Sequence, residues 1–217
     1  MGNSDAIAKA WRRINWIGVI AGVLTIALPF LGKWWQLTLG TGVVFMEISP
    51  FGTDIIIFEE SVSGAIGSPL LWWFLLGIKL VIVYLGVVLL AGSVLSISDR
   101  HVAIAEQFIH FSARKLLWLV VAFVAILFLF IVIVNHAPGI HDSSIGNAPF
   151  LLQTDLPYLI GEGEVSSVLE VMRFTCPIRM EFTKAFGIAV LAAALGVATR
   201  IYQKRLHNEK EKYKQTE

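Results

Sequence analysis

Four long apolar runs divide this chain and constrain its fold more than any other feature. Residues 14–31, 70–96, 115–135 and 185–202 are each close to the length of a bilayer-crossing helix, which needs about 20 residues. Hydrophobic residues make up 56% of the chain and charged residues only 15%, whereas soluble domains carry about a quarter charged residues. The runs therefore predict an all-α membrane bundle of four transmembrane helices.

Basic residues are sorted between the segments that separate these runs. Of the seventeen Lys and Arg residues, twelve lie in residues 1–13, 97–114, 203–217 or the adjoining helix ends, together with six acids, which leaves a charge of +6. The long loops 32–69 and 136–184 hold four basic residues against ten acids, a charge of −6. Because positive residues are retained on the cytoplasmic side, we expect a multi-pass plasma-membrane protein with both termini cytoplasmic.

The charges and the runs together give an expected order of segments. It is a cytoplasmic N-terminus at 1–13, helix 1 at 14–31, external loop 1 at 32–69, helix 2 at 70–96, a cytoplasmic link at 97–114, helix 3 at 115–135, external loop 2 at 136–184, helix 4 at 185–202 and a basic cytoplasmic tail at 203–217. The first run exceeds the roughly 7–15 apolar residues of a signal peptide and no A-x-A-like site follows it, so it is interpreted as a helix. The link leaves two alternatives: helix 3 starts early, or the stretch lies flat at the membrane surface.

All seven tryptophans fall near a predicted membrane boundary. Indole rings favour that depth because the ring is apolar and its N–H needs a partner. We therefore expect interface anchors at Trp11, Trp16, Trp34, Trp35, Trp72, Trp73 and Trp118.

Small residues recur at fourfold spacing in the first and fourth runs, which allows helix backbones to approach closely in lipid. The expected packing positions are Gly18, Gly22, Ala185, Ala189, Ala193 and Gly196. The third run carries bulky residues on all sides, so we expect it to face lipid or a partner.

The external loops carry strand patterns. Residues from about 171 to 182 alternate with a period of two, which places on one face Met172, Phe174, Cys176, Ile178, Met180 and Phe182. On that face the free thiol of Cys176 is expected to be buried as a small hydrophobe. We expect a small extracytoplasmic antiparallel sheet of three or four strands, built from both external loops, with residues 136–164 irregular.

This layout resembles the claudin and related tetraspan proteins, in which two external loops form a sheet and the last strand leads into helix 4. The resemblance is carried by the order of the segments alone. The Gly-Leu-Trp and two cysteines that mark claudins are missing, since residues 32–69 contain no cysteine. The resemblance implies a scaffold or adhesion role as an analogy of architecture.

Lys79 is the only charged residue well inside a predicted span, since Lys115 and Arg200 lie at the cytoplasmic ends of theirs. A charge at that depth is a candidate functional residue, here one that meets an acid of another subunit. The alternative is a structural lysine that extends its amine to the membrane surface.

Other candidate sites are weak. His136, His141 and Asp142 are metal-ligand types, but their spacing matches no metal motif, so a solvated turn is the alternative. No mid-span histidine is available for haem, and the Walker A, C-x-x-C and H-E-x-x-H motifs are absent. We expect no cofactor and no catalytic activity.

Three functions remain open. The first is a non-catalytic membrane protein that presents its external sheet to other membrane proteins or to copies of itself. The second is an accessory subunit of a respiratory or transport complex, and the third is a self-assembling channel subunit. The expected contacts are the lipid bilayer, including anionic lipid at the C-terminal tail, and no nucleic acid.

Overall fold

The computed structural model describes residues 15–40, 42–58, 60–61, 69–96, 101–136, 143–145, 148–169 and 172–215. The chain forms two compact units. Unit 1 comprises Met1–Leu31, Gly77–Val121 and Gly187–Glu217, and unit 2 comprises Gly32–Leu76 and Ala122–Phe186.

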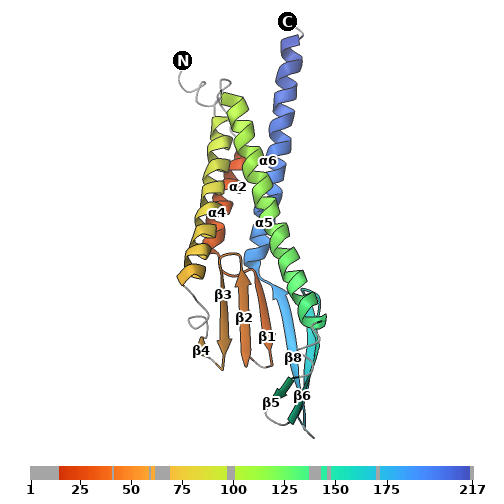
Figure 1. The fold of residues 1–217 in the computed structure, drawn as a ribbon. Helices are drawn as coiled ribbons and strands as arrows, with labels where there is room; N and C mark the ends of the chain where they lie inside the picture. Colours follow the sequence, from red (N-terminus) through yellow and green to blue (C-terminus); the bar gives the residue numbers. More distant parts are fainter. Residues whose placement is uncertain are drawn as a thin grey trace. The chain divides into compact units, whose positions relative to one another are not determined.

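The helices of the described chain are α2 (Trp16–Ala27), the short 3₁₀ helix η1 (Leu28–Phe30), α4 (Pro69–Leu95), α5 (Val102–His136) and α6 (Lys184–Gln215) (Figure 1). Three of them, α4, α5 and α6, contain stretches that are long and apolar enough to cross a membrane. The segment Trp16–Phe30 is apolar but shorter, because Pro29 has no N–H to continue the helical ladder. These helices fit a multi-pass membrane protein.

The structure resolves the two alternatives for the link that precedes helix 3. The helix α5 is continuous from Val102 to His136, so helix 3 starts early. Its first turns pack against α4, since a side chain at Gly92 would lie 3.0 Å from Phe108 Cβ and 3.1 Å from the carbonyl oxygen of Ala105.

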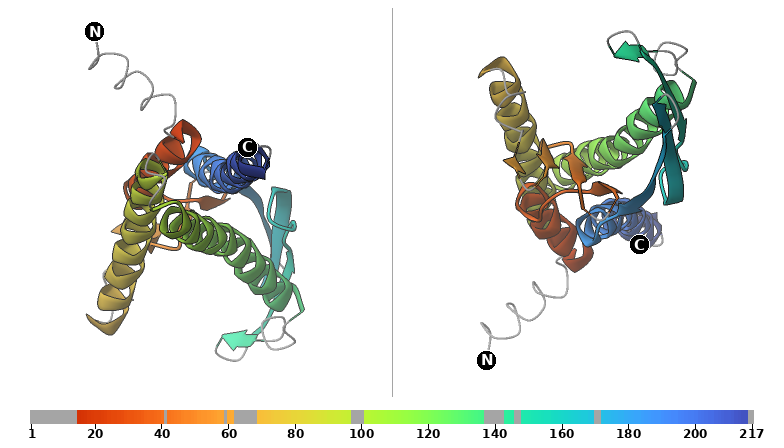
Figure 2. Two further views of the ribbon diagram at one scale, coloured as in Figure 1. Left: turned by 90° about the horizontal axis from the view of Figure 1, so that it is seen from above. Right: turned by 90° about the horizontal axis from the view of Figure 1, so that it is seen from below.

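Glycines mark close helix contacts in unit 1, where α2 lies beside one end of α4 (Figure 2). A Cβ at Gly86 would lie 2.8 Å from the backbone nitrogen of Ile26 and 2.9 Å from the carbonyl oxygen of Gly22. A Cβ at Gly18 would lie 2.1 Å from Ser93 Oγ. The helices α2 and α4 are therefore antiparallel and approach backbone to backbone.

Unit 2 contains an eight-stranded antiparallel sheet in the order β4-β3-β2-β1-β8-β7-β6-β5. The strands are β1 (Trp35–Leu39), β2 (Val44–Ser49), β3 (Gly52–Ile57), β4 (Glu60–Ser61), β5 (Ser143–Ile145), β6 (Ala148–Asp155), β7 (Gly161–Leu169) and β8 (Met172–Phe182) (Figure 1). The expectation of three or four strands is wrong, as is that of an irregular stretch at 136–164. Strand formation there depends on successive pairing, of β7 with β8, β6 with β7 and β5 with β6, rather than on local composition.

The register of the sheet separates an apolar face from a polar one. Leu37 pairs with Met46 and Met180, so these apolar side chains share one face. On the opposite face a row across four strands contains Asp54, Glu47, Gln36 and Glu181. The alternation along each strand therefore gives one face that can pack on protein and one suited to water.

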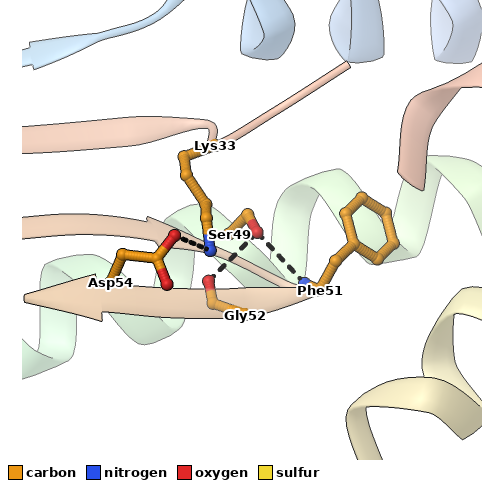
Figure 3. A network of polar contacts seen from close by, with 5 residues as sticks. All are labelled: Lys33, Ser49, Phe51, Gly52 and Asp54. Atoms are coloured by element: carbon orange, nitrogen blue, oxygen red, sulfur yellow. Dashed lines mark hydrogen bonds and ion pairs between the residues drawn. The ribbon is translucent and has the colours of Figure 1, made fainter. Parts of the chain in front are cut away.

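A polar network fixes the β2–β3 hairpin (Figure 3). Ser49 Oγ accepts from the N–H of Phe51 at 3.2 Å and donates to the carbonyl oxygen of Gly52 at 3.1 Å. Lys33 Nζ lies 2.7 Å from a carboxylate oxygen of Asp54. The hairpin turn places the Phe51 ring in the protein interior, where it is 5% exposed.

Candidate interaction site

The core of unit 2 centres on Trp34. Its ring centroid lies 5.5 Å from that of Phe51, 5.2 Å from that of Phe123 and 6.0 Å from that of Phe186, all in edge-on arrangements. Aromatic pairs in this geometry add to the stabilisation from burial alone. Trp34, Phe51 of the β2–β3 hairpin and Phe186 of α6 thereby hold Phe123 of α5 beside the start of the sheet.

The loop at 156–160 attaches the later part of α5 to the sheet. Asn135 Nδ2 donates to the carbonyl oxygen of Leu156 at 3.0 Å, and Asn135 Oδ1 accepts from the N–H of Leu156 at 3.3 Å. The rings of Phe128 and Tyr158 lie 5.9 Å apart. From Phe123 to Asn135, about 18 Å of helix at 1.5 Å per residue is thus held against the sheet and its loop.

This segment of α5 has a buried face and an exposed face. Phe123, Leu127 and Ile131 are buried against unit 2. The opposite side carries four large apolar side chains, which are 67%, 57%, 46% and 56% exposed in the order Ile126, Leu129, Phe130 and Ile133. We call these four residues the outer face of α5. Apolar patches of this kind mark contacts with a membrane or another protein.

The tryptophans occupy two kinds of environment. Four tryptophans are exposed, each over 46% or more of its surface: Trp16, Trp72, Trp73 and Trp118. Trp34 and Trp35 are fully buried, so protein rather than lipid covers their rings, and their position at a membrane boundary stays a prediction. The sheet register and the contact with Phe51 make them protein core. Trp11 lies outside the described residues.

Lys79 lies near one end of unit 1 rather than at its middle. It is half-buried, and no ion pair links it to another described residue. The contact between Gly22 and Gly86 sets the two antiparallel helices in register. Lys79 is seven residues from Gly86, about 10 Å, and Leu31 is nine residues from Gly22, about 14 Å. Lys79 is therefore roughly level with η1.

The remaining predicted sites do not assemble. His136 Nδ1 lies 3.0 Å from the carbonyl oxygen of Val132, while His141 and Asp142 lie outside the described residues. Among the residues that are described, no group of three or more His, Cys, Asp or Glu could hold a metal ion. Cys176 is exposed, so its expected burial is wrong; among the side chains that the structure describes on its face of β8, Ile178 and Met180 are buried.

The expected packing positions of the helices are all buried in the structure: Gly18, Gly22, Ala185, Ala189, Ala193 and Gly196. Gly196 lies against α5, since a Cβ there would be 3.5 Å from Ala113. The third run, expected to face lipid or a partner, has one buried row and an exposed opposite side; the buried row is Leu116, Val120, Phe123, Leu127 and Ile131.

A buried polar cluster in unit 1 escaped the sequence reasoning. Asn15 accepts from the N–H of Gly18 at 3.2 Å and donates to the carbonyl oxygen of Thr199 at 3.4 Å. Ser93 donates to its own helix, as small polar residues in helices do. The oxygens Ser112 Oγ and Gln203 Oε1 are buried and have no hydrogen-bond partner within the described part of the chain. The sequence signal that could have indicated this cluster was the presence of hydroxyl side chains, such as Ser93 and Thr199, inside apolar runs.

Comparison with protein-family models, curated proteins and solved structures found no match. The function is therefore argued from the geometry of the two units.

Proposed function

We propose that the chain is a non-catalytic four-helix membrane protein that associates with other membrane proteins, or with copies of itself, through its external sheet and the outer face of α5. Both termini are cytoplasmic in this proposal, as the charge distribution favours. The observation that carries the proposal is the exposed apolar side of a helix whose other side is fixed to a polar sheet.

The sheet cannot lie in hydrocarbon. Its two edges leave backbone groups without partners, which lipid does not tolerate. Its polar face carries Glu47, Asp54, Arg179 and Glu181, and the Arg179 side chain is 65% exposed. Water must therefore surround the sheet.

Residues 123–135 of α5 share the level of the sheet, because they are attached to it along their length. The outer face of α5 then lies beside the sheet rather than among acyl chains. Four large apolar side chains left in water would lose the free energy of burial, about 1.5–3 kcal/mol for each one fully covered. A protein surface of matching apolar character is the partner that this arrangement favours.

Paired alanine substitutions test the proposed contact. The variant Ile126→Ala with Ile133→Ala removes apolar volume from the outer face, and the control Leu80→Ala with Val87→Ala removes it from exposed positions of α4. In native mass spectrometry from gentle detergent, the first variant should lose at least about tenfold of its association constant, since 1.4 kcal/mol corresponds to tenfold. The control should keep it. Equal association of both variants with the native chain would exclude this contact.

Cysteine labelling tests the topology independently. A membrane-impermeant maleimide should label exposed Cys176 on intact cells. In a Cys176→Ser background, Lys204→Cys should react only after permeabilisation. Reaction of Lys204→Cys alone in intact cells would invert the orientation and refute the proposal.

The same background tests the depth of α5. When the purified chain is reconstituted in vesicles at high dilution, Ile133→Cys should react with the reagent, whereas Val121→Cys, which replaces a 47% exposed valine, should be protected by lipid. Protection at both positions would place the outer face in hydrocarbon and remove the argument for a protein partner.

The accessory-subunit alternative depends on Lys79 meeting an acid from a neighbour. Its position near the end of unit 1 favours the surface-reaching lysine instead. Lys79→Met should therefore leave expression and assembly unchanged. Loss of a co-purifying complex in this variant would favour the accessory subunit.

A further inference from the structure

A cleft on α5 of unit 1 combines basic and aromatic side chains. Its volume is about 520 Å³, and the described residues that line it are His110, Phe111, Arg114, Lys115 and Trp118. These residues belong to two adjacent rows of the helix, at spacings of four residues. Ser112, Ala113 and Leu116 between them are buried, so the cleft faces away from the helix contacts of the unit.

The helix contacts of unit 1 set the depth of the two bases. A Cβ at Gly92 of α4 would lie 3.0 Å from Phe108 Cβ. Six residues further along these two antiparallel helices, about 9 Å, Gly86 is level with Arg114. Gly86 in turn contacts Gly22 in the interior of α2. Arg114 is therefore level with the interior of an apolar helix rather than with either of its ends.

The same depth follows from the proposed function, on which this inference rests. Arg114 lies nine residues before Phe123, about 14 Å along the helix, and the proposed function places Phe123 at the level of the external sheet. In a hydrocarbon core of about 30 Å, Arg114 and Lys115 then lie close to the middle, deeper than the end of an apolar run. Without these two residues the cytoplasmic segments still hold ten basic residues against six acids, so the expected orientation is unchanged.

Neither base has an acidic partner within the described part of the chain. The ion pairs found among the described residues belong to unit 2. The nearest acid of α5 is Glu106, eight residues before Arg114, about 12 Å along the helix. Arg114 and Lys115 are exposed, and a charge that faces lipid at this depth is costly unless an opposite charge meets it.

We propose that the cleft receives a carboxylate from a transmembrane helix of a different membrane protein. The Arg114 guanidinium offers a planar fork that matches the two oxygens of a carboxylate, and Lys115 supplies a second positive charge. Phe111 and Trp118 border the two bases, and their rings are exposed. Trp and Arg are among the residues that contribute most to protein interfaces, so the lining suits a protein partner.

A second copy of this chain does not supply that acid. Copies that cross the membrane in the same direction present the same residues at the same depth, so a symmetric contact through this face sets Lys115 opposite Lys115. Like charges opposed across an interface disfavour association. The four apolar runs contain no acid, so another helix of a second copy offers none at this depth either. The partner is therefore a different protein.

The outer face of α5 continues from the cleft along one side of this helix. Spacings of three and four residues join the two, and the exposed residues in this row are Lys115, Trp118, Ala122, Ile126 and Leu129. Residues at these spacings are neighbours on the surface of a helix. One partner helix that runs along α5 can thereby contact both the cleft and the outer face.

Synthetic transmembrane peptides test the site on the full chain. Each peptide consists of about 20 leucine and alanine residues around one central residue, Glu in the probe and Gln in its matched control, and carries an acceptor dye. The chain carries a donor dye on Cys176 and is reconstituted in phosphatidylcholine vesicles, where energy transfer reports binding. Wild-type protein should bind the Glu peptide at least about tenfold more tightly, because a carboxylate forms charge-assisted hydrogen bonds that a neutral amide does not.

Two double variants locate this preference. Arg114→Gln with Lys115→Gln should abolish it. The control Arg200→Gln with Lys204→Gln removes the same charge from α6, outside the cleft, and should keep it. Equal binding of the two peptides by wild-type protein would overturn the proposal. A preference that survives in the cleft variant, or that both variants lose equally, would overturn it as well.

A shifted peptide covers the case in which the cleft variant fails to reach the membrane. With its Glu moved two turns from the centre, the peptide should bind wild-type protein as weakly as the Gln peptide does, and binding equal to that of the central Glu would refute the depth of the site. Labelling of Ile133→Cys and Val121→Cys judges the proposed function separately. If that labelling gives the expected pattern while the Glu preference is absent, only this inference fails.

Discussion

The contact between α2 and α4 gives the sharpest prediction about stability. At Gly86 an added Cβ would lie 2.6 Å from Ile26 Cγ1, 2.8 Å from Ile26 N and 2.9 Å from the carbonyl oxygen of Gly22. Two of these three atoms are backbone atoms, which cannot rotate away. Alanine in a helix is favoured over glycine by about 1 kcal/mol, but overpacking of a close contact costs about 1–3 kcal/mol. Gly86→Ala should therefore destabilise unit 1.

The matched control is Gly77→Ala in the same helix, where an added Cβ meets nothing within 4 Å. This variant gains helix propensity without a clash. Unfolding in mixed micelles with increasing SDS, followed by tryptophan fluorescence, should separate Gly86→Ala from the control by about 1–3 kcal/mol, which is the packing cost, because both variants gain the same helix propensity. If Gly86→Ala proved as stable as Gly77→Ala, the backbone-to-backbone contact would not exist as described.

Three further substitutions test unit 2. Trp35→Phe should cost about 1–3 kcal/mol more than Trp34→Phe in chemical denaturation, because Trp35 Nε1 donates to Leu159 at 2.8 Å whereas Trp34 Nε1 has no partner among the described residues; equal costs would contradict this. Asn135→Ala should lower amide-exchange protection at Ile160, whose N–H donates to the carbonyl oxygen of Tyr158 at 2.8 Å, by opening the loop, and unchanged protection would show that the loop is held otherwise. Asp54→Asn should cost less than about 1 kcal/mol in denaturation, since its side chain is 47% exposed; a larger loss would reveal a buried role.

The helices were largely predictable because their signals are local. Apolar length and charge sorting predict the runs, and small residues at fourfold spacing identify contacts such as those of Gly18 and Gly22. The end of α2 at Ala27 was missed because the effect of one proline was outweighed by the apolarity of the whole run. The buried position of Asn15 could not be read from its neighbours, because its partner Thr199 is 184 residues away.

Of the sheet, only a strand whose own sequence alternates between apolar and polar residues could be predicted. The alternation at 172–182 indicates β8, but β5 to β7 form through pairing, which the sequence does not display locally. The exposure of Cys176 could not be predicted for a similar reason. Alternation along a strand tells which face of the sheet a side chain lies on, but its burial depends on whether another element covers that part of the face. Trp34 and Trp35 show a related ambiguity, since an apolar ring near a helix end suits both a membrane boundary and a protein core.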